Sequence, residues 1–144
     1  MEIFTIGFVK KSAEQFFQIL KENHIECVVD IRLRPSGQLA GFTKQNDLKF
    51  FLKRLVGSDY LHLPILAPTR EILDAYRKDR NWQKYVTAFE QLMHERDIPS
   101  ALDRLQFESK RCCLLCSESE PSFCHRSLVS EMLAKAWDAA ISHL

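Results

Sequence analysis

Short apolar runs with strand character alternate with helix-like stretches along this chain, and that alternation restricts the fold more than any other feature. We predict strands over residues 2–6, 26–33, 60–63 and 111–116. Helices are predicted to begin at or near Ser12, Thr43, Thr69, Asn81, Pro99 and Pro121. Because short strands separated by helices are typical of βαβ units, the pattern indicates an α/β domain with a mainly parallel sheet.

The second predicted strand indicates how that sheet is covered. Its centre, Cys27-Val28-Val29, is a continuous apolar run rather than an alternating one. Strands buried on both faces have this composition, so we expect about four to five strands with helices on both faces. The 144 residues contain no repeat or linker and suffice for one core, which predicts a single α/β domain over residues 1–144.

The charge balance excludes some classes of protein. Twenty Lys and Arg residues stand against nineteen Asp and Glu residues, so the chain does not coat nucleic acid by bulk charge. No apolar run approaches the roughly 18 residues of a membrane helix, and the start lacks a basic segment ahead of an apolar one. We therefore expect a cytoplasmic protein without a membrane partner, whose five cysteines are reduced thiols.

Residues capable of chemistry follow the predicted strands. They are Gly7 after the first strand, Asp30 and Arg32 after the second, His62 in the third, and Cys116, Ser117, Glu118, Cys124, His125 and Arg126 after the fourth. Ligands of open parallel sheets bind beyond the carboxyl ends of the strands. We therefore expect these side chains to gather at one edge of the sheet.

The segment Cys124-His125-Arg126 has two interpretations. At the start of a helix, Cys124 would have a pKa lowered by the helix dipole and by cationic neighbours, which suits a nucleophile with His125 as its partner. Alternatively, the free amides and Arg126 hold a phosphate or carboxylate, and Cys124 is a small buried residue. Consecutive helix residues point about 100° apart, so the three cannot all face one ligand. Glu118 could accept a hydrogen bond from His125 or Arg126, or act as a general acid or base.

The other candidates also have a structural alternative. Asp30 and Arg32 would lie on one face of a strand, where they either pair with each other or act as a base and an anion-binding fork. His62, between two leucines, fits a half-buried, hydrogen-bonded strand histidine.

A zinc site built from Cys113-x-x-Cys116 with Cys124 and His125 is a further alternative. We disfavour it because residues 112–116 have the composition of a buried strand and because neighbouring ligands at 124 and 125 give poor geometry. No P-loop, GxGxxG or HExxH motif is present, so no cofactor is expected.

Basic residues are concentrated between positions 32 and 54. They are Arg32, Arg34, Lys44, Lys49, Lys53 and Arg54, with Asp47 as the only acid. This stretch either lines a groove for a polyanion or forms a solvated helix face, and we favour the solvated face.

Several short motifs occur in order along the chain. They are Thr5-Ile6-Gly7; Asp30-Ile31-Arg32 with Pro35; Tyr60-Leu61-His62-Leu63-Pro64; Cys116-Ser117-Glu118 with Pro121 and Cys124-His125-Arg126; and the tail Ile141-Ser142-His143-Leu144. Together they resemble the uncharacterised family called domain of unknown function 488, essentially from end to end. The resemblance implies a small α/β protein with a polar cleft and a short terminal strand carrying a histidine, but no established reaction.

Two positions depart from the pattern of that family. Phe8 stands where members usually have a histidine, and Ala67-Pro68 stands where they tend to have a Gly-rich turn. Less glycine leaves the backbone amides less freedom to wrap a phosphate. An enzyme silenced by Phe8 therefore stays an alternative to an active one.

We expect an enzyme or former enzyme that binds an anionic, phosphate-bearing small molecule or nucleic-acid end for hydrolysis or transfer. Arg32 and Arg126 would hold the anion, and Glu118 or Asp30 would handle protons. The alternatives are a noncatalytic nucleotide or nucleic-acid binding module and a zinc-stabilised structural protein.

Overall fold

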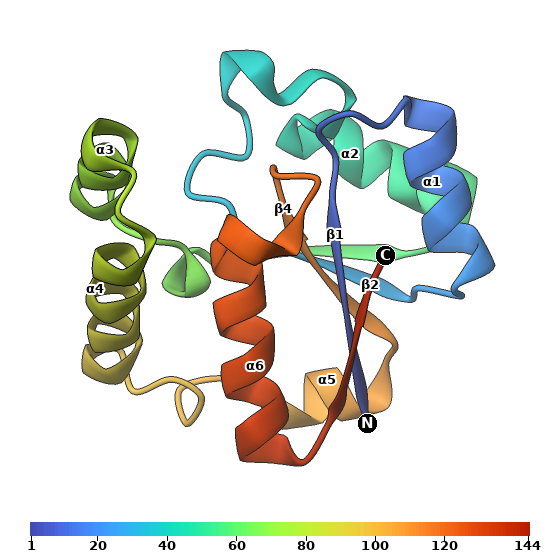
Figure 1. Cartoon of the computed structure of the whole chain (residues 1–144). Coiled ribbons are helices and arrows are strands. Elements are labelled where there is room, and N and C mark those ends of the chain that lie inside the picture. Colours follow the sequence, from blue (N-terminus) through green and yellow to red (C-terminus); the bar gives the residue numbers. More distant parts are fainter.

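The computed structural model describes the backbone of all 144 residues and every side chain except that of Gln38. The elements run in the order β1 (Glu2–Gly7), α1 (Ala13–Glu22), β2 (Cys27–Asp30), η1 (Gln38–Thr43), α2 (Gln45–Phe51), η2 (Leu52–Val56), β3 (Asp59–His62), η3 (Pro64–Leu66), α3 (Arg70–Asp79), α4 (Trp82–Glu95), α5 (Arg104–Ser109), β4 (Cys112–Cys116), η4 (Pro121–Phe123), α6 (His125–Trp137) and β5 (Ala140–His143) (Figure 1). The η segments are short 3₁₀ turns, except that η2 is a π-helical turn continuing α2.

The strands form one sheet in the order β3-β2-β4-β1-β5, and every pairing between them is parallel. Figure 1 shows α1 and α2 on one side of this sheet and α3, α4 and α6 on the other. The predicted α/β class, with a parallel sheet and helices on both faces, is confirmed. Among the described residues, no helix is long and apolar enough to cross a membrane.

Two buried cores hold the layers together. Strand side chains alternate between the faces, so Val29 and Leu114 pack with α4, α5 and α6, while Val28 and Leu115 pack with α1 and α2. Both sets are fully buried. The continuous apolar runs of β2 and β4 therefore reflect a sheet covered on both sides.

Several local predictions hold and others do not. Ser12, Thr69 and Asn81 cap their helices by accepting hydrogen bonds from backbone amides, as predicted. Pro99 does not open a helix; residues 99–101 form a turn, and α5 begins later, behind the cap Asp103. Thr43 does not cap α2, because its hydroxyl accepts a hydrogen bond from a buried arginine instead.

The predicted strand 26–33 is too long, since β2 ends at Asp30. The Asp30 carboxylate accepts the backbone N–H of Arg32 at 3.1 Å, a local turn that takes the chain out of the strand ladder.

The strand order creates a crevice between β2 and β4. From β2 the chain leads to β3 on one side, whereas from β4 it leads to β5 on the other side. Loops that leave neighbouring strands in opposite directions open a crevice at their carboxyl ends. In register, Asp30 pairs with His62 and Leu115, and Gly7 pairs with Cys116, so the strand-end residues share this edge.

Candidate functional site

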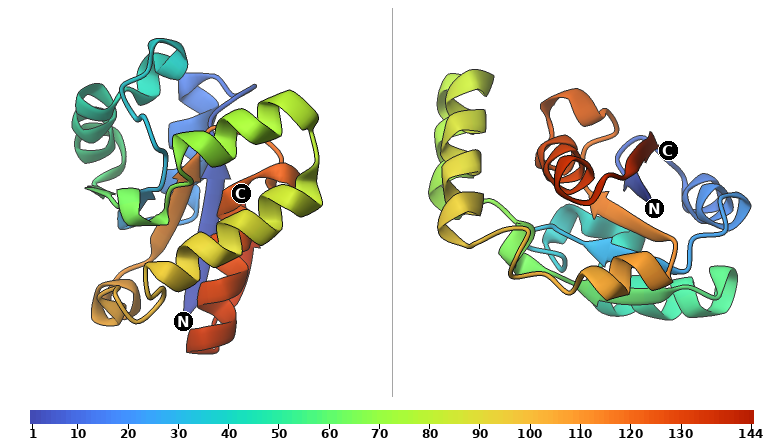
Figure 2. Two further views of the ribbon diagram at one scale, coloured as in Figure 1. Left: turned by 90° about the vertical axis from the view of Figure 1, so that its left-hand side faces the viewer. Right: turned by 90° about the horizontal axis from the view of Figure 1, so that it is seen from below.

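A cleft of about 430 Å³ opens at the carboxyl edge of β2 and β4. Its walls come from three segments: the loop 32–34 after β2, helix α3 with the start of α4, and residues 116–125 between β4 and α6. Figure 2 shows α3 and α4 as a helical hairpin beside α6. This hairpin supplies one wall of the cleft. The cleft therefore lies where the sequence predicted the polar residues to meet.

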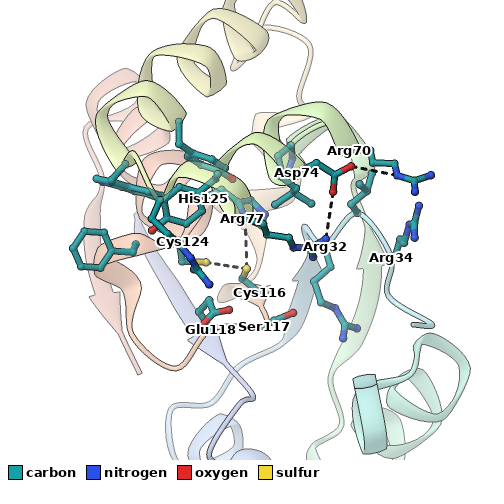
Figure 3. A pocket seen from close by; sticks show the side chains of 18 residues that line it. Arg32, Arg34, Arg70, Asp74, Arg77, Cys116, Ser117, Glu118, Cys124 and His125 are labelled. Atoms are coloured by element: carbon teal, nitrogen blue, oxygen red, sulfur yellow. Dashed lines mark hydrogen bonds and ion pairs between the residues drawn. The ribbon is translucent and has the colours of Figure 1, made fainter. Parts of the chain in front are cut away.

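Two thiols and an imidazole meet on one wall of this cleft (Figure 3). Cys116 is the last residue of β4, and its Sγ accepts a hydrogen bond from the Cys124 thiol at 2.9 Å. His125 Nδ1 lies 3.5 Å from the same sulfur. Cys124 has an extended backbone, with φ −132° and ψ 140°, and His125 is the first residue of α6. This break in backbone geometry lets adjacent residues 124 and 125 face one point.

The position of the His125 proton follows from its second hydrogen bond. His125 Nε2 lies 2.8 Å from the carbonyl oxygen of Ile31. A carbonyl oxygen only accepts, so Nε2 carries a proton, and Nδ1 is free to take the proton of Cys116. A thiol, an imidazole and a carbonyl group that orients the imidazole are thus in contact.

The electrostatics assign the thiolate to Cys116. The hydrogen bond from Cys124 and the neighbouring His125 hold the pKa of Cys116 well below its usual value, against the opposing effect of burial. Donating that hydrogen bond, together with burial, raises the pKa of Cys124 well above its usual value. Burial opposes a charge on His125, but the Cys116 thiolate and the Ile31 carbonyl raise its pKa overall. The expected lowering of the Cys124 pKa is therefore wrong, because Cys124 donates to Cys116.

Arg126 points away from the cleft. Its side chain is fully buried, and its guanidinium donates to the carbonyl oxygens of Glu118 and Ser119. Gly7 lies against the same loop, since a Cβ atom there would overlap the Glu118 carbonyl and the Arg126 guanidinium. Arg126 and Gly7 thus hold the loop after β4 in place. Neither is among the residues lining the cleft, so Cys124 and His125 line it and Arg126 does not.

Asp30 and Arg32 form a buried ion pair. Arg32 Nε donates to Asp30 Oδ1 at 2.9 Å and Arg32 Nη2 donates to Asp30 Oδ2 at 2.7 Å. The guanidinium also donates to the hydroxyl and carbonyl of Thr43, and Tyr60 donates its hydroxyl to Asp30 at 2.6 Å. His62 Nε2 lies 2.9 Å from the Arg32 carbonyl. The structure thus shows the pairing interpretation for Asp30 and Arg32, and a hydrogen-bonded strand histidine at position 62.

Glu118 and Ser117 lie on the floor of the cleft beside Cys116. Ser117 is half-buried and Glu118 is exposed. The backbone carbonyl of Glu118, rather than its carboxylate, bonds to Arg126. The carboxylate is therefore available to a ligand in the cleft.

Sequence reasoning missed the arginines of α3. Arg70, Arg77 and Arg80 line the cleft opposite the sulfur atoms, together with Arg34 from the loop after β2. Arg70 and Arg77 lie 3.6 Å and 3.5 Å from Asp74 and remain about 70% exposed. Their spacing of seven residues places them on one helix face, a signal that could have been found. Of the basic residues between positions 32 and 54, only Arg32 and Arg34 line the cleft.

Aromatic rings form the remaining wall. Trp82 stacks on Tyr85 with ring centroids 4.9 Å apart, and Phe123 meets Trp82 edge-on at 5.6 Å. Phe123 is 61% exposed, so its ring is accessible at the cleft. The cleft thus offers a flat apolar surface next to its arginines.

The two thiols and the imidazole on this wall are also potential metal ligands. Ligand atoms of Cys116, Cys124 and His125 all lie within 4.8 Å of one another. Cys113, part of the predicted zinc set, faces the core under α1 and α2 instead. A tetrahedral ion with Zn–S bonds of about 2.3 Å would hold two sulfur atoms about 3.8 Å apart. At 2.9 Å, the sulfur atoms of Cys116 and Cys124 are closer together than two such metal ligands would be.

Comparison with known protein families gives a match over most of the chain. The family model described as Domain of unknown function DUF488 matches residues 12–133. The chain belongs to this family. The DUF488 protein has no match among the curated proteins or among the solved structures.

The positions that depart from the DUF488 pattern can now be placed. Phe8 packs under the Arg32 guanidinium, 5.4 Å from its ring centroid, and against Phe42. It is not among the residues that line the cleft, whereas Pro68 is. The short terminal strand is present as β5, and Thr5 Oγ1 lies 2.6 Å from His143 Nδ1.

Proposed function

We propose that this DUF488 protein is a small enzyme that binds a nucleotide or a nucleic-acid end and hydrolyses or transfers a group through Cys116. One observation carries this proposal: exposed arginines, an aromatic wall and the Cys116–His125 pair all line the same cleft. Each feature recognises a different part of one ligand, namely phosphate, base and reacting centre.

Phosphate recognition is assigned to the arginines. Asp30 balances the charge of Arg32, which leaves four arginines in the cleft against two carboxylates, Asp74 and Glu118; the arginines are Arg34, Arg70, Arg77 and Arg80. The cleft thus carries an excess of positive charge in a chain whose formal net charge is only +1. Guanidinium groups bind phosphate oxygens in a bidentate manner, and local excess charge draws anions into the cleft.

Base recognition is assigned to the aromatic wall. Trp82 is anchored by its stacking on Tyr85, and Phe123 extends from η4 into solvent. Stacking of a base on such rings contributes about 1 to 3 kcal/mol per base and tolerates different bases. A simple phosphate would make no use of this wall, so a nucleotide fits the cleft better.

The chemistry is assigned to Cys116 and His125. The Cys116 thiolate would form a bond to the electrophilic centre, and the leaving group would depart with the proton held on His125 Nδ1. Water or an acceptor then releases the group from sulfur, and the Glu118 carboxylate is placed to remove a proton from that water.

Binding is tested by calorimetry with ADP, pyrophosphate and adenosine. We expect ADP to bind more tightly than either of its parts. Losing a charge-assisted hydrogen bond costs about 1.5–3 kcal/mol, so Arg77→Gln should weaken ADP binding by about ten-fold or more. Lys78→Gln removes the same charge from the next position of α3, outside the cleft, and should leave binding unchanged. Equal losses in the two variants, or no binding of ADP by the wild-type protein, would contradict the proposal.

Turnover is tested by incubating a nucleotide panel with the protein and separating the products by chromatography. Cys116→Ser should abolish turnover and retain ADP affinity. Phosphate binding without turnover in the wild-type protein would support the alternative of a noncatalytic binding module.

A further inference from the structure

Four of the five cysteines form two close pairs in different surroundings. Cys116 and Cys124 line the cleft, with their sulfur atoms 2.9 Å apart. Cys27 and Cys112 are register partners on β2 and β4 and lie together in the core. The second pair is an internal control for any chemistry proposed for the first.

The cleft pair is close to bonding distance. A disulfide has an S–S bond of about 2.05 Å, so the sulfur atoms of Cys116 and Cys124 need to approach by less than about 1 Å. Cys116 is held in β4, but Cys124 is the extended residue between the turn η4 and helix α6. Cys124 lies outside the sheet, so this shift requires no change in the pairing of β4.

The surroundings of the cleft pair favour oxidation. Both sulfur atoms lie at the wall of an open cleft, next to a histidine and an excess of arginines. A thiolate that small molecules can reach, with a second thiol beside it, is typical of cysteines that are reversibly oxidised. Cys27 and Cys112 do not line the cleft and are packed among apolar side chains of the core. Packing among apolar groups away from the cleft keeps the oxidant from these two sulfur atoms.

We infer that Cys116 and Cys124 form a reversible oxidation site, at which a small hydroperoxide converts the thiol pair into a disulfide. The Cys116 thiolate attacks one peroxide oxygen, so that an S–O bond forms, the O–O bond breaks and hydroxide leaves. The Cys124 sulfur then attacks the Cys116 sulfenic acid, so that the S–S bond forms and the S–O bond breaks. The departing hydroxide takes the Cys124 proton as water, and the two sulfur atoms have given two electrons to the peroxide.

Oxidation would also control the cleft. The disulfide removes the Cys116 thiolate and its contact with His125, and it ties the start of α6 to the end of β4. This consequence rests on the proposed function, because it assumes that Cys116 performs the reaction. Formation of the disulfide itself does not depend on any activity.

The test exposes the reduced wild-type protein to hydrogen peroxide, blocks the remaining thiols with iodoacetamide and maps the peptides by mass spectrometry. We expect a disulfide between Cys116 and Cys124 that forms at least about ten times faster than any between Cys27 and Cys112. Dithiothreitol should reverse it. In Cys124→Ser, Cys116 should instead accumulate as a sulfenic acid that dimedone traps, and Cys112→Ser should leave the cleft reaction unchanged.

Several outcomes would overturn the inference. One is conversion of Cys116 to sulfinic acid in the wild-type protein without a disulfide, and another is equal oxidation rates for the two pairs. Stoichiometric zinc in the purified protein, released only when these thiols are oxidised, would assign the cluster to a metal instead. A disulfide that forms in a protein with no nucleotide binding would uphold the oxidation site while removing the proposed function.

Discussion

The substitution Asp30→Asn tests the buried ion pair between Asp30 and Arg32 most directly. The Asp30 side chain is fully buried and accepts hydrogen bonds from the Arg32 guanidinium, the Arg32 amide and the Tyr60 hydroxyl. Asp30→Asn keeps the shape but leaves a 5% exposed guanidinium without its counter-ion. Removing one partner of a buried pair costs about 3–5 kcal/mol, a loss on the order of 10 °C in Tm for a domain of this size.

Urea unfolding at pH 7, followed by circular dichroism, measures this change in the free energy of unfolding. Glu90→Gln on the exposed surface of α4 is the control and should change stability by less than about 0.5 kcal/mol. The double variant Asp30→Leu with Arg32→Met removes both charges and should recover much of the loss. A loss below about 1 kcal/mol in Asp30→Asn would refute the reasoning, because it would show that Arg32 is solvated and free to bind an anion.

Three further predictions concern the loop, the thiols and the effect of high pH. Gly7→Ala should lower stability by about 1–3 kcal/mol, because a Cβ atom there overlaps the Glu118 carbonyl; unchanged urea unfolding would contradict this contact. Iodoacetamide should label Cys116 with an apparent pKa below the free-thiol value of about 8.5, and Cys124 only at higher pH. The reverse order in peptide mass spectra would exchange their roles. Burial and the hydrogen bond to Asp30 raise the pKa of Tyr60, so the folded protein keeps a proton that the unfolded chain loses above about pH 10. The free energy of unfolding should therefore fall as pH rises past 10, and Tyr60→Phe should make that fall shallower.

Local sequence patterns predicted the α/β class, because apolar strand runs and helix-capping residues depend only on neighbouring residues. The unbroken apolar run Cys27–Val29 required cover on both faces of the sheet, and Thr69 and Asn81 stand where helix-capping residues are needed. The same reasoning was wrong at Thr43, which does not cap α2 because its hydroxyl accepts a hydrogen bond from the buried Arg32. A contact between residues eleven positions apart in a loop has no periodic signal.

The site was predicted in outline, because strand-end residues of a parallel sheet share an edge whatever the strand order. The order β3-β2-β4-β1-β5 decided that the cleft lies between β2 and β4, and the crossover after β3 brought Arg70 and Arg77 to it. The sequence by itself determined that cysteine, histidine and arginine follow one buried strand. Only the tertiary structure decided that Arg126 turns inward while Cys116 meets Cys124, because that depends on where helix α6 begins relative to β4.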